Sequence, residues 1–293
     1  MKRALDLLGF PPDTKLLVIH ADDLGMCHSV NAATFSALDE QAISSASVMV
    51  PCPWFAEVAE YARRNPGSDL GVHLTLTSEW KYYRWRPVTG ELGASLVDDT
   101  GHFFHQATGA AWNLEEAQKE LSAQIAEARR AGIIPTHIDS HMLAVLESVD
   151  LTRAYMELGR RNVIPFLAFG SMKSGSAKTG VEHLVRDSDI VVDKVFSIRP
   201  GFPERDWKEY YLRVLRSITP GLNQLIVHLG HDDSELQAVA AGHAFWGAGW
   251  RQRDYDVIMS DEFRSELKQN NIQLIGWNKL NSLRELSSSS SER

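Results

Sequence analysis

The chain has 293 residues, of which 44% are hydrophobic and 23% charged, and its 38 acidic and 30 basic residues give a formal net charge of −8. This composition is typical of a globular protein, and the acidic balance argues against nucleic acid or an anionic membrane as the partner. No apolar run approaches the ~20 residues of a membrane-spanning helix, and prolines interrupt the apolar stretch at the N-terminus before a signal-peptide core could form. We therefore expect a cytoplasmic protein, and the two cysteines, Cys27 and Cys52, fit a reducing compartment.

The first expected strand ends in adjacent acidic residues. Residues 16–19 are apolar, His20, Asp22 and Asp23 follow them, and Gly25 ends the pattern. Such carboxylates are common in a solvated turn, where a strand ends and the next helix is capped. A divalent cation would also relieve the repulsion between the two groups and leave one of them free to act as a base. Both interpretations stand at this point of the chain.

Strand and helix patterns alternate through the remainder of the chain. We expect helices over residues 29–40, 54–64, 113–132 and 150–161 and after residue 203. We expect strands over residues 44–50, 70–77, 135–141, 163–169, 190–197, 221–229 and 272–277. This alternation indicates parallel βα units, which carry functional groups at the C-terminal ends of their strands. The glycine-containing segment 170–180 lacks phosphate-binding spacing and is expected to be a flexible loop.

Two of these strands place histidines on a polar face. In the strand at 70–77, apolar and polar residues alternate, so His73 lies on the polar face. In the following strand, the same alternation puts His137, Asp139 and His141 on one face, in steps of about 7 Å. A lone histidine is more often structural, and the three ionisable groups could form a salt-bridge network. A metal site is the better interpretation, because a divalent cation binds neutral imidazoles and carboxylates and these strands could converge.

Two segments, residues 79–87 and 243–254, combine aromatic rings with cationic side chains. The rings could simply pack at the mouth of the fold. If they stay exposed, they could stack on the apolar faces of sugar rings while the cationic groups hydrogen-bond the hydroxyls. The candidate substrate-binding residues are Trp80, Tyr82, Trp85, Arg86, Trp250 and Arg251.

Three motifs occur in order: ADDLG at 21–25, GVHLTLT at 71–77 and PTHIDSH at 135–141. With them the chain resembles the YdjC family of carbohydrate deacetylases, which includes chitooligosaccharide deacetylases. Each motif alone is modest, but together they are specific. The resemblance implies a TIM-barrel-like α/β fold, a divalent metal and hydrolysis of an N-acetyl group on a sugar. We therefore expect a distorted β/α barrel in one domain at 15–285, with an N-terminal extension at 1–14 and a disordered tail at 286–293.

The resemblance also implies roles for particular residues. By position in the motifs, Asp23, His73 and His141 match the ligands of one divalent metal ion, and Asp22 matches the catalytic base. The resulting hypothesis is amide hydrolysis by a metal-activated water, with Asp22 removing the proton of that water and His228 protonating the departing amine. Two imidazoles and a carboxylate suit zinc, whereas completion by water oxygens would suit magnesium.

Further residues of the third motif, His137 and Asp139, would support the ligands. The chain departs from the chitooligosaccharide members in two places. It has Met142 and Leu143 where those members continue with histidines, and Leu229 where they have proline. These departures bear on the sugar and leave the metal chemistry intact.

Two alternatives remain at this stage. One is a metal-dependent amidase or deacylase acting on a non-sugar substrate, and the other is a non-catalytic carbohydrate-binding protein. Retention of Asp22 beside a complete ligand set argues against the second, because binding alone needs no base. The expected partner is a small-molecule carbohydrate, with no nucleic acid and no membrane, and a homodimer is left open.

Overall fold

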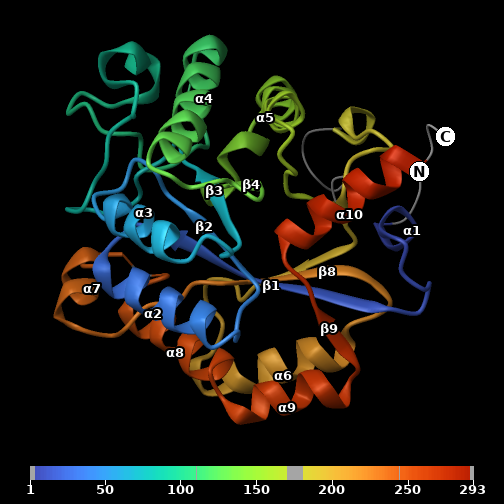
Figure 1. Ribbon diagram of the computed structural model, residues 1–293. Helices are drawn as coiled ribbons and strands as arrows, with labels where there is room; N and C mark the ends of the chain where they lie inside the picture. The colour runs from blue at the N-terminus through green and yellow to red at the C-terminus, as the bar shows by residue number, and fades with distance from the viewer. Residues whose placement is uncertain (1–3, 110, 170–180, 244, 291–293) are drawn as a thin grey trace.

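A curled sheet of parallel strands forms the core of the chain (Figure 1). The computed structural model describes residues 4–109, 111–169, 181–243 and 245–290. The main sheet has the strand order β4-β3-β2-β1-β8-β7, and all of these pairings are parallel. Its strands are β1 (Lys15–Leu24), β2 (Ser45–Val48), β3 (Leu70–Leu74), β4 (Ile138–Ser140), β7 (Lys194–Phe196) and β8 (Gly221–Val227).

Two short strands bring the ends of this sheet together. β5 (Ala168–Phe169) pairs with β6 (Val191–Val192), and a parallel bridge joins Ile138 of β4 to Phe166. Only Asp193 separates β6 from β7, which pairs with β8. The strands therefore form a distorted β/α barrel in a single domain, which confirms the predicted fold. Among the described residues no strand pairing joins β5 to β7, so the barrel wall is interrupted there.

Helices cover the outside of the barrel (Figure 1). They are α1 (Ala4–Leu8), α2 (His28–Asp39), α3 (Phe55–Arg64), α4 (Leu114–Arg130), α5 (Val149–Asn162), α6 (Trp207–Ser217), α7 (Ser234–Val239), α8 (Ala248–Ile258), α9 (Asp261–Gln269) and α10 (Trp277–Ser290). Helix α4 begins as its sequence predicts, because the Asn113 side chain accepts hydrogen bonds from the backbone N–H groups of Glu115 and Glu116. Short 3₁₀ segments are η1 (Gly90–Leu96), η2 (His141–Leu146), η4 (Glu182–Leu184) and η5 (Glu204–Asp206).

The side chains of β1 alternate between two cores. Leu17 and Ile19 belong to the larger buried cluster, which includes residues of the covering helices. Leu16 and Val18 belong to a smaller cluster that also contains Trp277. Because successive strand residues point to opposite faces, the same alternation carries His20 and Asp22 onto the barrel interior.

Two predicted strands differ from those observed. The strand expected at 190–197 is divided at Asp193, whose carboxylate accepts a hydrogen bond from the N–H of Leu222. The strand expected at 272–277 is only β9 (Ile272–Leu274), which pairs with the first half of β1, and Trp277 begins α10 instead. The loop expected at 170–180 lies outside the described residues.

The two ends of the chain pack together at the N-terminal ends of the strands (Figure 1). Leu5 and Leu8 of α1 lie in the smaller core cluster with Trp277 and Leu280 of α10. The segment expected to be an extension, residues 1–14, therefore contributes to the core. Helix α10 also takes in residues 286–290 of the expected disordered tail, since a helix already anchored by buried residues extends with one further hydrogen bond per residue. Among the described residues, none of the helices is long and apolar enough to cross a membrane.

Candidate metal centre and active site

A bulge at the end of β1 places Asp22 and Asp23 on the same site. The pairing of β1 with β2 shifts register between Ala21 and Leu24, and Asp23 has a φ of 68°, in the left-handed region. In a regular strand adjacent side chains point to opposite faces, but an extra residue at a bulge redirects one of them. Aspartate tolerates the left-handed conformation better than most residues do. The sequence therefore delivers two neighbouring carboxylates to one cavity.

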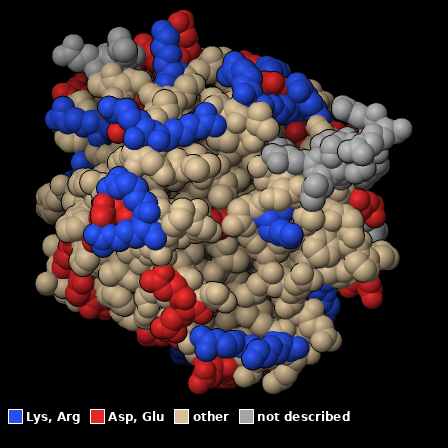
Figure 2. Space-filling view, viewed as in Figure 1, with Lys and Arg blue, Asp and Glu red and all other residues tan. Residues whose placement is uncertain are grey.

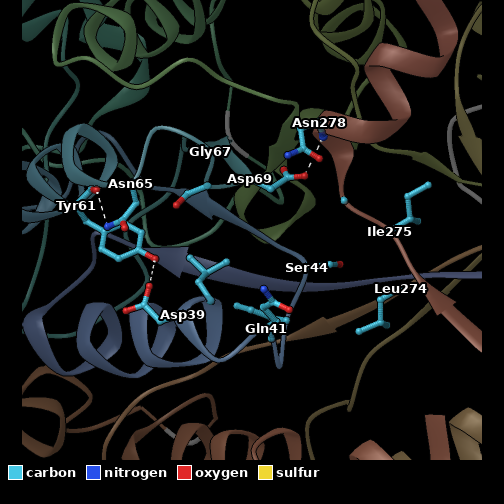
Figure 3. A pocket seen from close by; sticks show the side chains of 14 residues that line it. Asp39, Gln41, Ser44, Tyr61, Asn65, Gly67, Asp69, Leu274, Ile275 and Asn278 are labelled. Carbon is cyan, nitrogen blue, oxygen red and sulfur yellow. Dashed lines mark hydrogen bonds between the residues drawn. The ribbon is translucent and has the colours of Figure 1, made fainter. Parts of the chain in front are cut away.

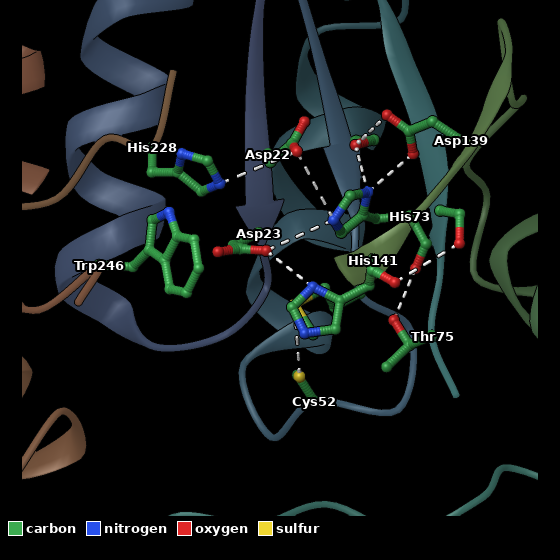
Figure 4. A network of polar contacts seen from close by, with 12 residues as sticks. Asp22, Asp23, Cys52, His73, Thr75, Asp139, His141, His228 and Trp246 are labelled. Atoms are coloured by element: carbon green, nitrogen blue, oxygen red, sulfur yellow. Dashed lines mark hydrogen bonds and ion pairs between the residues drawn. The ribbon is translucent and has the colours of Figure 1, made fainter. Parts of the chain in front are cut away.

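Three side chains from separate strand ends converge on one carboxylate oxygen (Figure 4). His73 Nε2 lies 3.4 Å from Asp23 Oδ1, and His141 Nδ1 lies 3.2 Å from the same atom. One donor atom from each of the three residues lies within 4.8 Å of the others. The structure thus brings together the three residues that the resemblance marked as metal ligands.

Carboxylates behind the two histidines fix the orientation of the rings. His73 Nδ1 lies 2.8 Å from Asp139 Oδ1, which leaves Nε2 directed at Asp23. His141 Nε2 lies 2.9 Å from Glu79 Oε2, which leaves Nδ1 directed at Asp23. Metal-binding histidines usually have their second nitrogen held in this way, because the bond sets the tautomer and strengthens the ligand. Asp139 therefore has the supporting position that was predicted for it.

The donor set fits a divalent cation. Asp23 Oδ1 is buried and accepts no hydrogen bond, although two imidazole nitrogens face it. The other oxygen, Oδ2, accepts a hydrogen bond of 2.6 Å from Arg251, so it is already occupied. An unpartnered buried carboxylate oxygen is costly, and a shared cation would satisfy it together with both nitrogens.

Without a metal, protons occupy this centre. Burial alone would lower the pKa of His141, but the carboxylates of Glu79 and Asp23 outweigh burial and raise the pKa to about 9. Burial would raise the pKa of Asp23, but the Arg251 guanidinium and the two histidines hold it well below the ordinary value. A metal must therefore displace protons from the imidazoles, and its affinity should increase with pH.

Asp22 and His228 form the opposite side of the centre (Figure 4). Asp22 Oδ2 lies 3.8 Å from His73 Nε2 and 3.9 Å from His228 Nε2. Burial lowers the pKa of His228, and the nearby Asp23 and Asp22 carboxylates only partly offset this. His228 follows β8, and its backbone N–H donates to the buried carboxylate of Asp254 at 2.9 Å. The predicted base and the predicted acid are therefore neighbours.

A buried polar network continues below the centre. His20 Nε2 lies 2.9 Å from Asp139 Oδ2 and 3.3 Å from Asp22 Oδ1, so it links the predicted base to the support of His73. His137, which was expected to support the ligands, does not contact them. Its ring stacks on Trp277 with a centroid distance of 5.2 Å, and its Nε2 has no hydrogen-bond partner. That prediction is corrected, because His137 lies one strand step too deep in the barrel.

The centre is part of the lining of a cavity of about 860 Å³. The lining residues beyond the centre come from the ends of β4 to β8, from α6 and from the segment before α8. They include Met142, Leu143, Leu167, Phe169, Val195, Phe196, Ile198, Arg199, Tyr210, Ile226 and Trp246.

Most of the predicted sugar platform lies elsewhere. Trp80, Trp85 and Trp250 are buried in the core, so their rings offer no face to a sugar. Tyr82 is 73% exposed but is absent from the lining of this cavity, as is Arg86. The stacking prediction is therefore corrected for these rings, because apolar indole surface packs more favourably in the core than against solvent.

Arg251 also has a different role from the predicted one. It is buried, and it binds Asp23 and the backbone oxygen of Trp246. It therefore orients a candidate metal ligand. Sequence reasoning also gave no role to Glu79 or His20. The period-two pattern shared with Asp22 could have identified His20, whereas nothing in the sequence relates the loop position of Glu79 to His141.

A second cavity, of about 550 Å³, lies at the opposite ends of the strands (Figure 3). Asp39, Tyr61, Asp69 and Asn278 are among its lining residues, and the Tyr61 hydroxyl donates to Asp39 at 2.7 Å. Figure 2 shows charged side chains gathered mainly toward the margin of the face that it draws, with fewer in its hollowed centre. This cavity shares no residue with the metal centre.

The fold and the site define a β/α-barrel protein with a carboxylate and imidazole centre suited to a divalent metal. A family model described as YdjC-like protein matches residues 16–269, so the chain belongs to the YdjC-like family. A carbohydrate deacetylase from Thermus thermophilus is 33% identical over 261 residues, which cover 87% of this chain and 90% of the relative. A chitooligosaccharide deacetylase from Yersinia enterocolitica is 34% identical over 132 residues, 43% of this chain and 49% of the relative.

A solved structure supports the fold over nearly the whole chain. It comes from Enterococcus faecalis V583 and is provisionally named a cellobiose-phosphate cleavage protein. Its TM-score is 0.77 at 26% identity, with 91% of this chain and 99% of that chain covered.

Proposed function

We propose that this chain is a metal-dependent carbohydrate deacetylase that hydrolyses the N-acetyl group of an amino sugar or oligosaccharide. The observation that carries the proposal is the unpartnered Asp23 Oδ1 faced by His73 Nε2 and His141 Nδ1, with Asp22 beside it. The printed names of the Thermus and Yersinia relatives support the same activity. Asp23, His73 and His141 would hold the ion.

When bound, a divalent cation would polarise the acetyl carbonyl and stabilise the negative charge that develops on its oxygen. Asp22 has the position of the base. His20 lies at Oδ1 of Asp22, which leaves Oδ2 to accept a proton from the attacking water. Water adds to the acetyl carbon as this proton leaves.

His228 is the proposed acid. Its Nε2 lies 3.9 Å from Asp22 Oδ2, so the proton removed from water can reach the departing nitrogen through this imidazole. Because burial lowers the pKa of His228, its protonated form gives up the proton readily. The C–N bond then breaks, and acetate and a free amine leave.

The choice of metal is part of the proposal. Two imidazoles and one carboxylate with open positions are typical of catalytic zinc. Magnesium prefers an oxygen-rich shell completed by water and is the alternative. Elemental analysis of the purified protein distinguishes them.

The activity is tested by measuring acetate release from di-N-acetylchitobiose. We expect acetate and free amine in equal amounts, loss of release with a chelator, and recovery when zinc or magnesium is restored. Asp22→Asn should keep the metal and lower turnover by about 10²–10⁴-fold, whereas His73→Ala should lose metal and turnover together. Asp99→Asn, at an exposed loop position, is the matched control and should change neither.

Two outcomes would contradict the proposal. Metal-loaded protein that binds N-acetylated sugars without releasing acetate would favour the carbohydrate-binding alternative. Release from simple N-acetylated amines, with none from sugars, would favour the non-sugar amidase.

A further inference from the structure

The part of the 860 Å³ cavity nearest the interruption of the barrel wall is mainly apolar. Five side chains from three strand ends contribute to it. They are Met142 and Leu143 after β4, Phe169 at the end of β5, and Phe196 and Ile198 at the end of β7. The cationic lining residues, Lys194 and Arg199, are exposed to solvent. We call the five apolar residues the apolar wall.

Two residues of the apolar wall have an unfavourable backbone and an unfavourable exposure. Met142 and Leu143 have φ values of 53° and 54°, in the left-handed region that asparagine and glycine adopt more readily. Their side chains are 44% and 47% exposed. Neither feature benefits the folded chain by itself, since a polar residue tolerant of this conformation would be more stable at both positions. Strain of this kind is typically retained where it serves a site.

The apolar wall is continuous with the proposed metal centre. Met142 directly follows His141, whose Nδ1 faces Asp23. An acyl group held at the centre therefore lies within a few bond lengths of Met142 and Leu143. An unsubstituted sugar presents mostly hydroxyl groups, which need hydrogen-bond partners that these five side chains do not supply.

We propose that the apolar wall binds an alkyl or aryl group carried by the amino-sugar substrate, which makes the preferred substrate more apolar than an N-acetylated sugar alone. The group could be carried on either of two atoms of the sugar, as an acyl chain longer than acetyl or as a substituent on the anomeric oxygen. This inference rests on the proposed function for the position of the acyl group. The apolar contact itself requires only binding.

Calorimetric titration of the metal-loaded Asp22→Asn variant tests the inference without turnover. The first pair of probes is the methyl and hexyl β-glycosides of N-acetylglucosamine, and the second pair is N-acetyl- and N-hexanoylglucosamine. Each buried methylene should increase affinity about fourfold, so burial of only two should give a gain of at least about tenfold. A gain in the first pair assigns the apolar group to the anomeric oxygen, and a gain in the second assigns it to the acyl chain. No gain in either pair overturns the inference.

A substitution separates the apolar wall from general effects on the fold. Asparagine suits the left-handed backbone, so Leu143→Asn added to the same protein should fold with an unchanged or higher melting temperature. We expect it to bring the hexyl-to-methyl or hexanoyl-to-acetyl affinity ratio toward one. Val163→Asn is the matched control, because Val163 is also apolar, has a φ of 57° and is 62% exposed, but does not line the cavity. It should leave the ratio unchanged, and an equal loss in both variants would overturn the inference.

Failure of this inference and failure of the proposed function are distinguishable. If wild-type protein releases acetate from di-N-acetylchitobiose but neither probe pair shows a gain, the function stands and the apolar wall does not. If a probe pair shows a gain that Leu143→Asn removes, but wild-type protein releases no acid from any probe, the apolar wall stands and the deacetylase proposal fails.

Discussion

At the scale of single residues, the metal centre depends on side chains that contact the ligands rather than the substrate. Glu79 and Asp139 each hold the second nitrogen of a histidine, and Arg251 holds the second oxygen of Asp23. Each of these contacts leaves one donor atom of a ligand pointing at the same place. The centre is therefore preorganised by charges drawn from a loop, a strand and a helix.

Glu79→Gln tests the support of His141. The amide retains the size of the side chain but removes the charge that strengthens the imidazole as a ligand. We expect metal affinity to fall by about 10–100-fold, as is usual for the loss of such a partner. Competition with a chelating dye measures this affinity. Glu60→Gln on α3, which alters an exposed ion pair with Arg63, is the control, and equal affinities in the two variants would contradict the role of Glu79.

His20 gives the metal-free protein a pH dependence. Burial would lower the pKa of His20, but Asp139 and Asp22 outweigh burial and raise the pKa to about 9. In the unfolded chain histidine has a pKa of about 6.5, so the folded state binds this proton more tightly. The stabilisation is complete below pH ~6.5 and is lost as pH rises through about 9, with an upper limit of roughly 3 kcal/mol.

Urea unfolding with chelator at pH 6 and at pH 9.5 measures this dependence. We expect the unfolding free energy of the wild type to fall more than that of His20→Asn between the two conditions. His73 and His141 contribute in both proteins, so only the difference between the two falls belongs to His20. Equal falls would show that His20 is neutral in the folded protein.

The sequence predicted the ligands better than their supports. Period-two alternation and the three motifs identify Asp22, Asp23, His73 and His141, because short-range spacing fixes which face of a strand each residue occupies. Glu79 and Arg251 reach the centre only through tertiary structure, so no local pattern marks them. The same limit explains the buried tryptophans, since sequence shows that a ring is present but not whether the fold covers it.

At the scale of elements, close contacts between neighbouring strands fix the position of the polar network. A side chain at Gly71 of β3 would overlap the ring of His137, so only glycine lets that imidazole lie between the strands. Gly71→Ala should therefore lower the free energy of unfolding by about 1–3 kcal/mol, as overpacking usually does.

Gly67→Ala is the natural comparison for that variant. A Cβ at Gly67 would meet nothing within 4 Å, so the substitution should be neutral or add about 0.4–1 kcal/mol. Urea unfolding measures both variants. Equal stabilities would mean that His137 moves aside at no cost.

The short strands were the hardest elements to predict. β5 has two residues and β4 three, and both are defined by pairing with distant segments rather than by their own patterns. Helices such as α4 were predicted well, because caps and a 3.6-residue period are local signals. The order of strands around the barrel follows from parallel connection rules, but its interruption between β5 and β7 does not.

At the scale of the whole molecule, the barrel is closed at one end by helices from both ends of the chain. Leu5 of α1 is buried against the smaller core cluster. Leu5→Ala should therefore lower the free energy of unfolding by about 2–5 kcal/mol, which urea unfolding would detect. Asp13→Ala, at an exposed position of the same segment, should have no such effect. A chain that tolerates both changes equally would support the expectation of an independent extension.

The meeting of α1 and α10 also has a mechanical consequence (Figure 1). A force applied between the two ends of the chain pulls these helices apart one contact at a time, while β1 and β8 remain paired along their whole length. The first rupture should be a small extension at low force that leaves the metal centre intact at the far ends of the strands. Optical tweezers would measure it, and a metal-sensitive first rupture would show that the load passes through the barrel instead.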